Sequence, residues 1–288
     1  MATGYDENDY DYYAHDYENL VYESAASNEC EVINIFNSSN FCANIPSYPL
    51  SIWTASGNIL SGIPIICGGE LQDQQHEGRR MVDSCYTFNV TTNSWKFLSK
   101  MSKQRADFAS VALKGALWVT GGNTKMDEKG SHARSHDKST EFVYLNGSVS
   151  QGPDLPTARD DHCMVTLPDD RIMILGSDGG MTNPNSVVVY DPEAKEFLNA
   201  SPMLYARDGA GCVLIYSPLH GNRPVVLVAG GKDMATAEIL DYTYTNSWEE
   251  SKEYLISIIQ LPLKIVDLVK VKFLDEMDLR MLTNFIFI

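Results

Sequence analysis

Four segments of this chain repeat one pattern at a nearly constant spacing. In each segment an apolar run ends in a small, glycine-type pair. The pairs are Gly68-Gly69, Gly121-Gly122, Gly176-Ser177 and Gly230-Gly231, so successive copies lie 53, 55 and 54 residues apart. A fixed period of this size indicates one supersecondary unit per repeat, and such units bury a core by stacking on their neighbours. The chain is therefore expected to be an array of similar units.

Each unit reads as four short strands. An arginine opens the first strand in three units, in RADFASVAL from Arg105, RDDHCMVTL from Arg159 and RDGAGCVLI from Arg207. The second strand is the apolar run before the glycine pair, and two such runs joined by a short polar turn predict a hairpin. The third strand carries a tyrosine: Tyr86, Tyr144, Tyr190 or Tyr242. The fourth carries Trp95, Phe197 or Trp248, and the second unit has no aromatic there.

The residue types fit a radial arrangement of small sheets. Glycine after the second strand lets the backbone turn where a Cβ atom would clash. A sheet packed between two neighbours buries both faces, so its strands read as continuous apolar runs. Large aromatic side chains on the outer strands would fill the space that widens away from the axis.

With these motifs in phase, the chain resembles the kelch-repeat β-propeller family, whose blades run at roughly 50 residues. The resemblance covers residues 29–250. It implies an all-β propeller with four recognisable blades. An unrelated β-sandwich with chance glycines is the alternative, but a sandwich does not need a 54-residue period.

The two ends raise the question of ring closure. Residues 29–48 align with 185–205 and read as the last two strands of a further blade, with Phe36 and Phe41 near the aromatic positions. Residues 251–288 form an apolar tail without glycine. Either the tail supplies two degenerate strands, at about 254–260 and 264–273, and completes a fifth blade, or it is foreign to the fold and the propeller is incomplete. An incomplete propeller would have no independent function.

Charge separates an N-terminal segment from the repeats. The net charge is −16, and residues 1–28 together with Glu29 hold eight acidic residues, six tyrosines and no lysine or arginine. Such a segment is expected to be disordered, as a plain acidic tail, a site of tyrosine sulfation or phosphorylation, or a docking tail for a basic partner. The overall acidity argues against nucleic acid as a partner. No apolar run reaches the roughly 20 residues of a membrane span.

The cysteines and the N-terminus point to different compartments. The start lacks the basic and apolar regions of a signal peptide, which favours the cytoplasm. Two pairs lie opposite each other in predicted hairpins and are candidate disulfides, Cys67 with Cys85 and Cys30 with Cys42. Cys163 and Cys212, on the first strands of adjacent blades, are expected to be buried thiols. The disulfide pairs and the sequons favour an extracellular protein, and the sequons are Asn37, Asn89, Asn146 and Asn199.

Other motifs carry little catalytic signal. His132 and His136 have the i, i+4 spacing of zinc ligands on a helix, but their segment reads as a solvated polar loop. Asp160, Asp161 and His162 form either an acid–base cluster or polar residues at the start of a strand near the axis. We expect no metal and no cofactor.

The resemblance implies binding rather than catalysis. In kelch adaptors, arginines near the start of the first strand surround the mouth of the channel and hold acidic peptides, which suggests that role for Arg105, Arg159 and Arg207. We therefore expect a non-catalytic module that binds a protein or glycan through its loops. The alternatives are a propeller enzyme of the oxidase or sugar-epimerase type, and a substrate-recognition fragment of a cullin-type ubiquitin-ligase adaptor, although residues 1–29 cannot form the BTB domain of such adaptors. The oligomeric state is left open.

Overall fold

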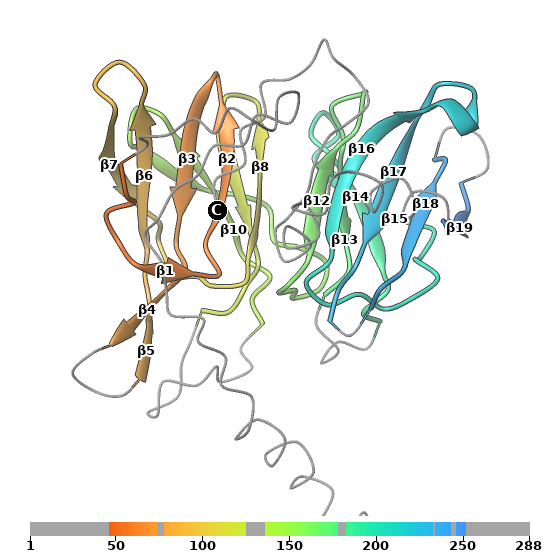
Figure 1. Cartoon of the computed structure of the whole chain (residues 1–288), viewed down its shortest axis with the longest axis horizontal. Coiled ribbons are helices and arrows are strands. Elements are labelled where there is room, and N and C mark those ends of the chain that lie inside the picture. Colours follow the sequence, from red (N-terminus) through yellow and green to blue (C-terminus); the bar gives the residue numbers. More distant parts are fainter. Residues whose placement is uncertain are drawn as a thin grey trace, which may run out of the picture.

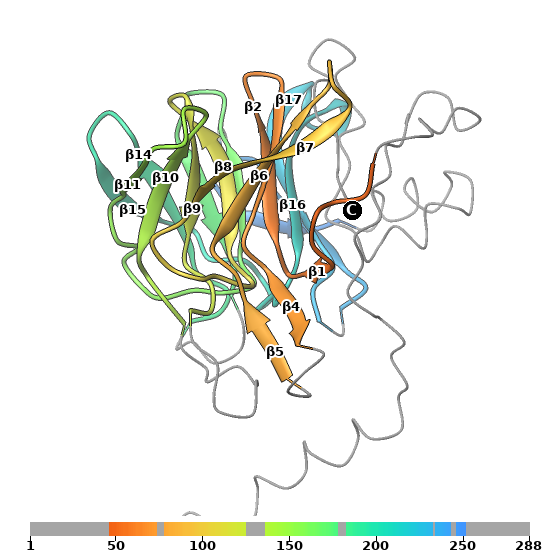
Figure 2. The same cartoon turned by 90° about the vertical axis from the view of Figure 1, so that its left-hand side faces the viewer.

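The four repeats fold into four antiparallel sheets that stand side by side around a common axis (Figures 1 and 2). The structure is a computed structural model, and it describes residues 46–73, 78–124, 136–177, 183–232, 234–242 and 246–251. Each sheet has four strands and contains one glycine pair. The described part of the chain thus confirms the predicted all-β propeller architecture.

Strand order is the same in every blade and follows the chain. Blade 1 contains β2 (Ser56–Leu60), β3 (Ile63–Cys67), β6 (Ser84–Asn89) and β7 (Ser94–Lys100). Blade 2 contains β8 (Ala109–Leu113), β9 (Ala116–Thr120), β10 (Thr140–Tyr144) and β11 (Val149–Gln151). Blade 3 contains β12 (Cys163–Thr166), β13 (Ile172–Leu175), β14 (Val187–Asp191) and β15 (Glu196–Ala200). Blade 4 contains β16 (Gly211–Ser217), β17 (Arg223–Ala229), β18 (Ala237–Leu240) and β19 (Trp248–Glu250), with the short 3₁₀ helix η2 (Pro218–His220) between β16 and β17.

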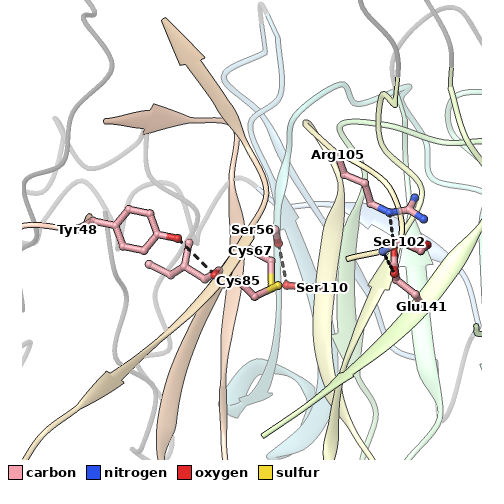
Figure 3. Close-up of a disulfide and its surroundings, with 9 residues drawn as sticks. Tyr48, Ser56, Cys67, Cys85, Ser102, Arg105, Ser110 and Glu141 are labelled. Atoms are coloured by element: carbon pink, nitrogen blue, oxygen red, sulfur yellow. Dashed lines mark hydrogen bonds and ion pairs between the residues drawn. A yellow bond between two sulfur atoms is a disulfide. The ribbon is translucent and has the colours of Figure 1, made fainter. Parts of the chain in front are cut away.

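The first strand of each blade lies innermost. Strand β2 contacts β8, β8 contacts β12, and β12 contacts β16. The side chains of Ser56 on β2 and Ser110 on β8 share a hydrogen bond of 2.8 Å between their hydroxyl groups (Figure 3). These contacts define the propeller axis and place the later strands of each blade farther from it.

Blade 1 carries an additional small sheet that the sequence pattern did not predict. Strands β4 (Glu70–Asp73) and β5 (Gly78–Met81) form a hairpin, and β1 (Ile52–Trp53) pairs with β4. This hairpin replaces the simple loop between the second and third strands and projects from one end of the propeller (Figures 1 and 2).

Apolar layers between blades form the core. Between blades 1 and 2 lie Ile65, Cys67, Phe108, Leu117 and Val119, all almost fully buried. Trp118 joins the second layer, where it packs against Tyr190 and Phe197 of blade 3 with ring centroids 4.8 and 6.4 Å apart. The third layer, between blades 3 and 4, includes Trp248. Burial on both faces explains why these strands are continuously apolar.

The glycine pairs are the points where blades meet. A Cβ atom on Gly68 would lie 2.6 Å from the carbonyl oxygen of Arg105 in the next blade, and one on Gly121 would collide with the carbonyl oxygen of Arg159. The amide of the second glycine completes the contact, since Gly69 N–H donates to Arg105 O at 2.8 Å. Every glycine of these pairs has a positive φ, which only glycine adopts readily, and Ser177, the second residue of the pair in blade 3, does not. The motif therefore exists so that the backbone of the following blade can approach.

The aromatic motif is only partly in register. Trp95, Phe197 and Trp248 occupy equivalent places on the outermost strands. The third-strand partners of Phe197 and Trp248 lie opposite the residue four before the glycine pair, and Phe88, the partner of Trp95, follows Thr87, which lies opposite the residue three before it. The tyrosines differ in their pairing. Tyr86 pairs two residues before its glycine pair, Tyr190 four and Tyr144 five, while Tyr242 follows the end of β18. The four tyrosines, expected to be in phase, therefore do not occupy equivalent positions on their third strands.

Several predicted segments lie outside the described residues. They are the acidic segment 1–28, almost all of the half-blade 29–48, and the tail after Ser251 with its two strands. Residues 46–53 are described and lie against blade 1. Tyr48 packs edge-on against Tyr86 and Trp95, and its hydroxyl donates to Ile66 O at 3.4 Å (Figure 3).

Candidate functional site at the loop end of the propeller

One end of the propeller gathers the long connections. In an antiparallel four-stranded blade, the loop between the second and third strands and the link to the next blade leave from the same end. We call this end the loop face; it comprises the β4–β5 hairpin, the links 101–108, 155–162 and 203–210, and the loops that follow the glycine pairs. Loops fixed on a rigid scaffold are the usual place for recognition residues.

The three arginines of the repeat lie in these links but do not face solvent. Arg105, Arg159 and Arg207 are each 1% exposed. Each guanidinium donates to backbone carbonyl groups of its own blade; Arg207 Nη1, for example, bonds Gly230 O at 2.6 Å and Thr236 O at 2.8 Å. The predicted arginine rim is therefore not formed. These side chains are enclosed and hold the link against the sheet, a role that the strand pattern alone does not reveal.

Two of the arginines are paired with a buried carboxylate. Arg105 Nε lies 3.1 Å from Glu141 Oε1 (Figure 3), and Arg207 Nε lies 2.7 Å from Glu238 Oε1. Both glutamates are fully buried. Their second oxygens accept backbone N–H groups of the links, from Ser102 at 2.7 Å and Leu204 at 2.6 Å. Pairing and complete hydrogen bonding are what make buried charges tolerable.

Blade 3 has lost this pair. Val188 stands where the glutamate stands in blades 2 and 4, since all three pair with the residue two before their glycine pair. Pro156 stands where the N–H donor would be, and proline has no N–H to satisfy. Arg159 Nε is buried without a hydrogen-bond partner, and burial lowers the pKa of Arg159 to about 10. Blade 1 also lacks both the glutamate and the N–H donor. Tyr86 stands at the glutamate position, Pro49 at the donor position, and Ile52 replaces the arginine.

A chain of backbone hydrogen bonds joins the links around the axis. Asp107 N–H donates to Thr54 O at 3.2 Å, Asp161 N–H to Asp107 O at 2.8 Å, and Gly209 N–H to Asp161 O at 3.0 Å. The four residues are equivalent positions of successive links, and all have positive φ between 48° and 68°. This ladder fixes the links at the axis relative to each other.

A polar network lies beside the ladder. Asn123 Nδ2 donates to Asp160 Oδ2 at 2.8 Å, and His136 Nδ1 lies 2.8 Å from Asp160 Oδ1. His162 is buried and its Nε2 bonds Thr120 Oγ1 at 2.8 Å. His136 is thus held by the network rather than free in a solvated loop as predicted. His132 lies outside the described residues, and the residues that are described contain no cluster of three or more metal-ligating side chains.

The link into blade 4 exposes two neighbouring large side chains, whereas Leu50, in the link before blade 1, is half-buried. Leu204 is 48% and Tyr205 41% exposed. The corresponding residues are Ser102 and Lys103 before blade 2, Pro156 and Thr157 before blade 3, and Pro49 and Leu50 before blade 1. The Leu204–Tyr205 pair is held in place, because Leu204 N–H is bound by Glu238 and the guanidinium carbon of Arg207 lies 5.9 Å from the Tyr205 ring centroid.

Two disulfides stabilise the described part of the chain. Cys67 and Cys85 are bonded between adjacent strands of blade 1, as predicted (Figure 3). Cys163 and Cys212 are bonded as well, which corrects the expectation of two buried thiols. Their Cα atoms lie 6.0 Å apart because the innermost strands of adjacent blades run side by side. Cys30 and Cys42 lie outside the described residues.

No long apolar helix that could cross a bilayer occurs among the residues with a described structure.

Comparisons with known proteins agree with this architecture. No protein-family model matches the chain. Beta-scruin from Limulus polyphemus is 28% identical over 180 residues, which make up 59% of this chain and 19% of that protein. The chain thus spans less than a fifth of that relative's length. A solved structure titled "Structure of YjhT" superposes with a TM-score of 0.60 at 13% identity and covers 74% of both chains, a likeness that concerns the fold alone. Four-stranded blades, glycine pairs at the blade contacts and these similarities together identify the fold as a kelch-like β-propeller.

Proposed function

We propose that the chain is a non-catalytic interaction module that binds a protein partner through its loop face. The exposed Leu204–Tyr205 pair is the observation that carries this proposal. Tyrosine is enriched at the energetic centres of protein interfaces, because it offers a large apolar surface with a polar tip and loses little conformational freedom. The buried Arg207–Glu238 ion pair beneath it provides a rigid base.

The expected partner contact is therefore the Leu204–Tyr205 pair and not the three arginines. Enclosed guanidinium groups cannot hold an acidic peptide, so replacement of Arg105, Arg159 and Arg207 would damage the fold before it reported on binding. Contact through Leu204 and Tyr205 needs no rearrangement of the links, since both side chains already reach solvent.

The test is partner capture by cross-linking in cells that make the protein. The double variant Leu204→Ser, Tyr205→Ser should lose the proteins that the unmodified chain captures. A matched control is Phe97→Ser, because Phe97 is 54% exposed on the outermost strand of blade 1, away from the loop face. Capture that is lost with Phe97→Ser but retained by the double variant would refute the loop-face assignment.

We also propose that the chain works in an oxidising compartment. Disulfides persist in secreted proteins and are rare in the cytosol. The two disulfides of the described residues support this location, and counting free thiols in native protein with and without reduction tests it. At least four cysteines should react only after reduction; six free thiols would place the chain in a reducing compartment.

A further inference from the structure

Two asparagines occupy equivalent turns at the end of the propeller opposite the loop face. Asn89 begins the turn between β6 and β7, and Asn146 lies within the turn between β10 and β11, which Tyr144 begins. Both are followed two residues later by a hydroxyl side chain, Thr91 and Ser148, with valine or glycine between. Asn-x-Ser/Thr is the acceptor pattern for N-linked glycans.

Turn chemistry accounts for part of this pattern. Asn89 Oδ1 accepts Thr91 N–H at 2.9 Å, and Asn146 Oδ1 accepts Ser148 N–H at 2.9 Å. Asp191 starts the β14–β15 turn in the same way as Asn89, by accepting Glu193 N–H at 2.8 Å. The turn therefore needs an oxygen acceptor at its first position, which aspartate supplies as well as asparagine. It does not need an amide nitrogen there. The Ser148 hydroxyl also donates to Asn146 Oδ1 at 2.7 Å, but the turn at Asp191, with Glu193 two residues later, forms without a hydroxyl.

The features that the turn does not need are the ones that glycosylation needs. Asn146 is exposed, and Asn89 is half-buried at the end of its strand next to Val90, which is 72% exposed. The described residues form no hydrogen bond with Nδ2 of either asparagine, and Nδ2 is the atom that carries a glycan. The disulfides independently indicate the compartment in which glycans are attached.

We propose that Asn89 and Asn146 carry N-linked glycans. In the reaction Nδ2 forms a bond to the anomeric carbon of an oligosaccharide carried on a lipid diphosphate. The bond from that carbon to the diphosphate oxygen breaks, the lipid diphosphate leaves, and one amide proton passes to a base. The glycans project from the outer hairpins of blades 1 and 2, at the end opposite Leu204 and Tyr205, so they leave the loop face free for a partner.

The experiment uses the full chain isolated from the tissue that makes it. Release of glycans by an amidase in heavy-oxygen water converts each glycosylated asparagine to a labelled aspartate, which peptide mass spectrometry locates. Label at Asn89 and Asn146 supports the proposal. Unlabelled asparagine at both positions overturns it, whatever the outcome for partner binding.

Variants of the full chain made in a secreting cell separate the glycan from the turn. Asn89→Asp and Asn146→Asp keep the turn oxygen, as Asp191 shows, and each should remove one glycan step on a gel without changing the melting temperature of the enzymatically deglycosylated protein. Asp191→Asn is the matched control, because Pro192 and Glu193 follow it and no acceptor pattern arises. A gel pattern unchanged in the Asn89→Asp, Asn146→Asp double variant would overturn the assignment, whereas any step that remains after two are lost belongs to the other acceptor patterns, at Asn37 and Asn199.

Discussion

At the scale of single residues, the recurring place of the arginine in the repeat occurs both with and without a buried carboxylate partner. In blades 2 and 4 the guanidinium meets a buried glutamate, whereas in blade 3 it meets Val188. The paired proline, Pro156, removes the N–H group that would otherwise lose its acceptor. Valine in place of the glutamate is thus accompanied by proline in place of the N–H donor. Arg159 still donates to the backbone carbonyl groups of its own blade.

This difference predicts unequal costs for the same substitution. Arg207→Met leaves Glu238 buried without its cation and should lower the free energy of unfolding by about 3–5 kcal/mol. Arg159→Met removes a buried charge that has no carboxylate partner, so only carbonyl hydrogen bonds are lost, at about 1–2 kcal/mol. Urea denaturation of the two variants measures the difference. Equal costs would show that the glutamate does not matter to the arginine.

A second residue-scale prediction concerns acid. Burial raises the pKa of Asp137, but hydrogen bonds from Lys103 and Ser139 outweigh it and lower the pKa to about 2 from the ordinary 3.8. The stabilisation is therefore present above about pH 4 and is lost as the pH falls towards 2. Its size is at most about 2 kcal/mol, because Lys103 is half-exposed and its ion pair is screened. Asp137→Asn should flatten the pH dependence of stability in this range, and an unchanged slope would contradict the assignment.

At the scale of elements, local patterns predicted the strands but not their relations across blades. The Cys67–Cys85 bond follows from the geometry of a hairpin, and the hairpin can be predicted from the sequence. The Cys163–Cys212 bond depends on two innermost strands meeting across a blade boundary, which only packing determines. The tyrosine register was missed for a similar reason, because strand pairing places the tyrosine at a different distance from the glycine pair in each blade. Burial of the arginines was missed because the position of a residue in the repeat does not reveal which other residues cover its side chain.

The inter-blade disulfide gives a prediction at this scale. Replacing Cys163 and Cys212 together by serine should lower stability by about 2–4 kcal/mol, since the bond closes a long loop in the unfolded chain. The loss should loosen the contact between blades 3 and 4, so amide hydrogen exchange should rise in β12 and β16 more than in β2. The corresponding change at Cys67 and Cys85 should act within blade 1. Unchanged exchange in β12 and β16 would contradict a role in holding the blades together.

At the scale of the whole molecule, the four described blades follow one another around the axis, and no further described blade follows blade 4. The first glycine of blades 1, 2 and 3 faces the arginine carbonyl oxygen of the following blade. Gly230 holds the same place in blade 4 and also has a positive φ, yet a Cβ atom there would meet no atom of the described residues within 4 Å. Blade 4 also carries a separate apolar cluster, which includes Val225, Leu227 and Ile239, on the face turned away from blade 3.

The central claim is that the glycine pairs exist to dock one blade on the next, and two alanine variants test it most directly. Gly121→Ala and Gly230→Ala share the cost of about 1–2 kcal/mol for a side chain at positive φ. Only Gly121→Ala also forces a Cβ atom against Arg159 O, so we predict that it unfolds the protein at a clearly lower urea concentration than Gly230→Ala does. Equal midpoints for the two variants would contradict the claim, because the glycines would then serve the turn alone.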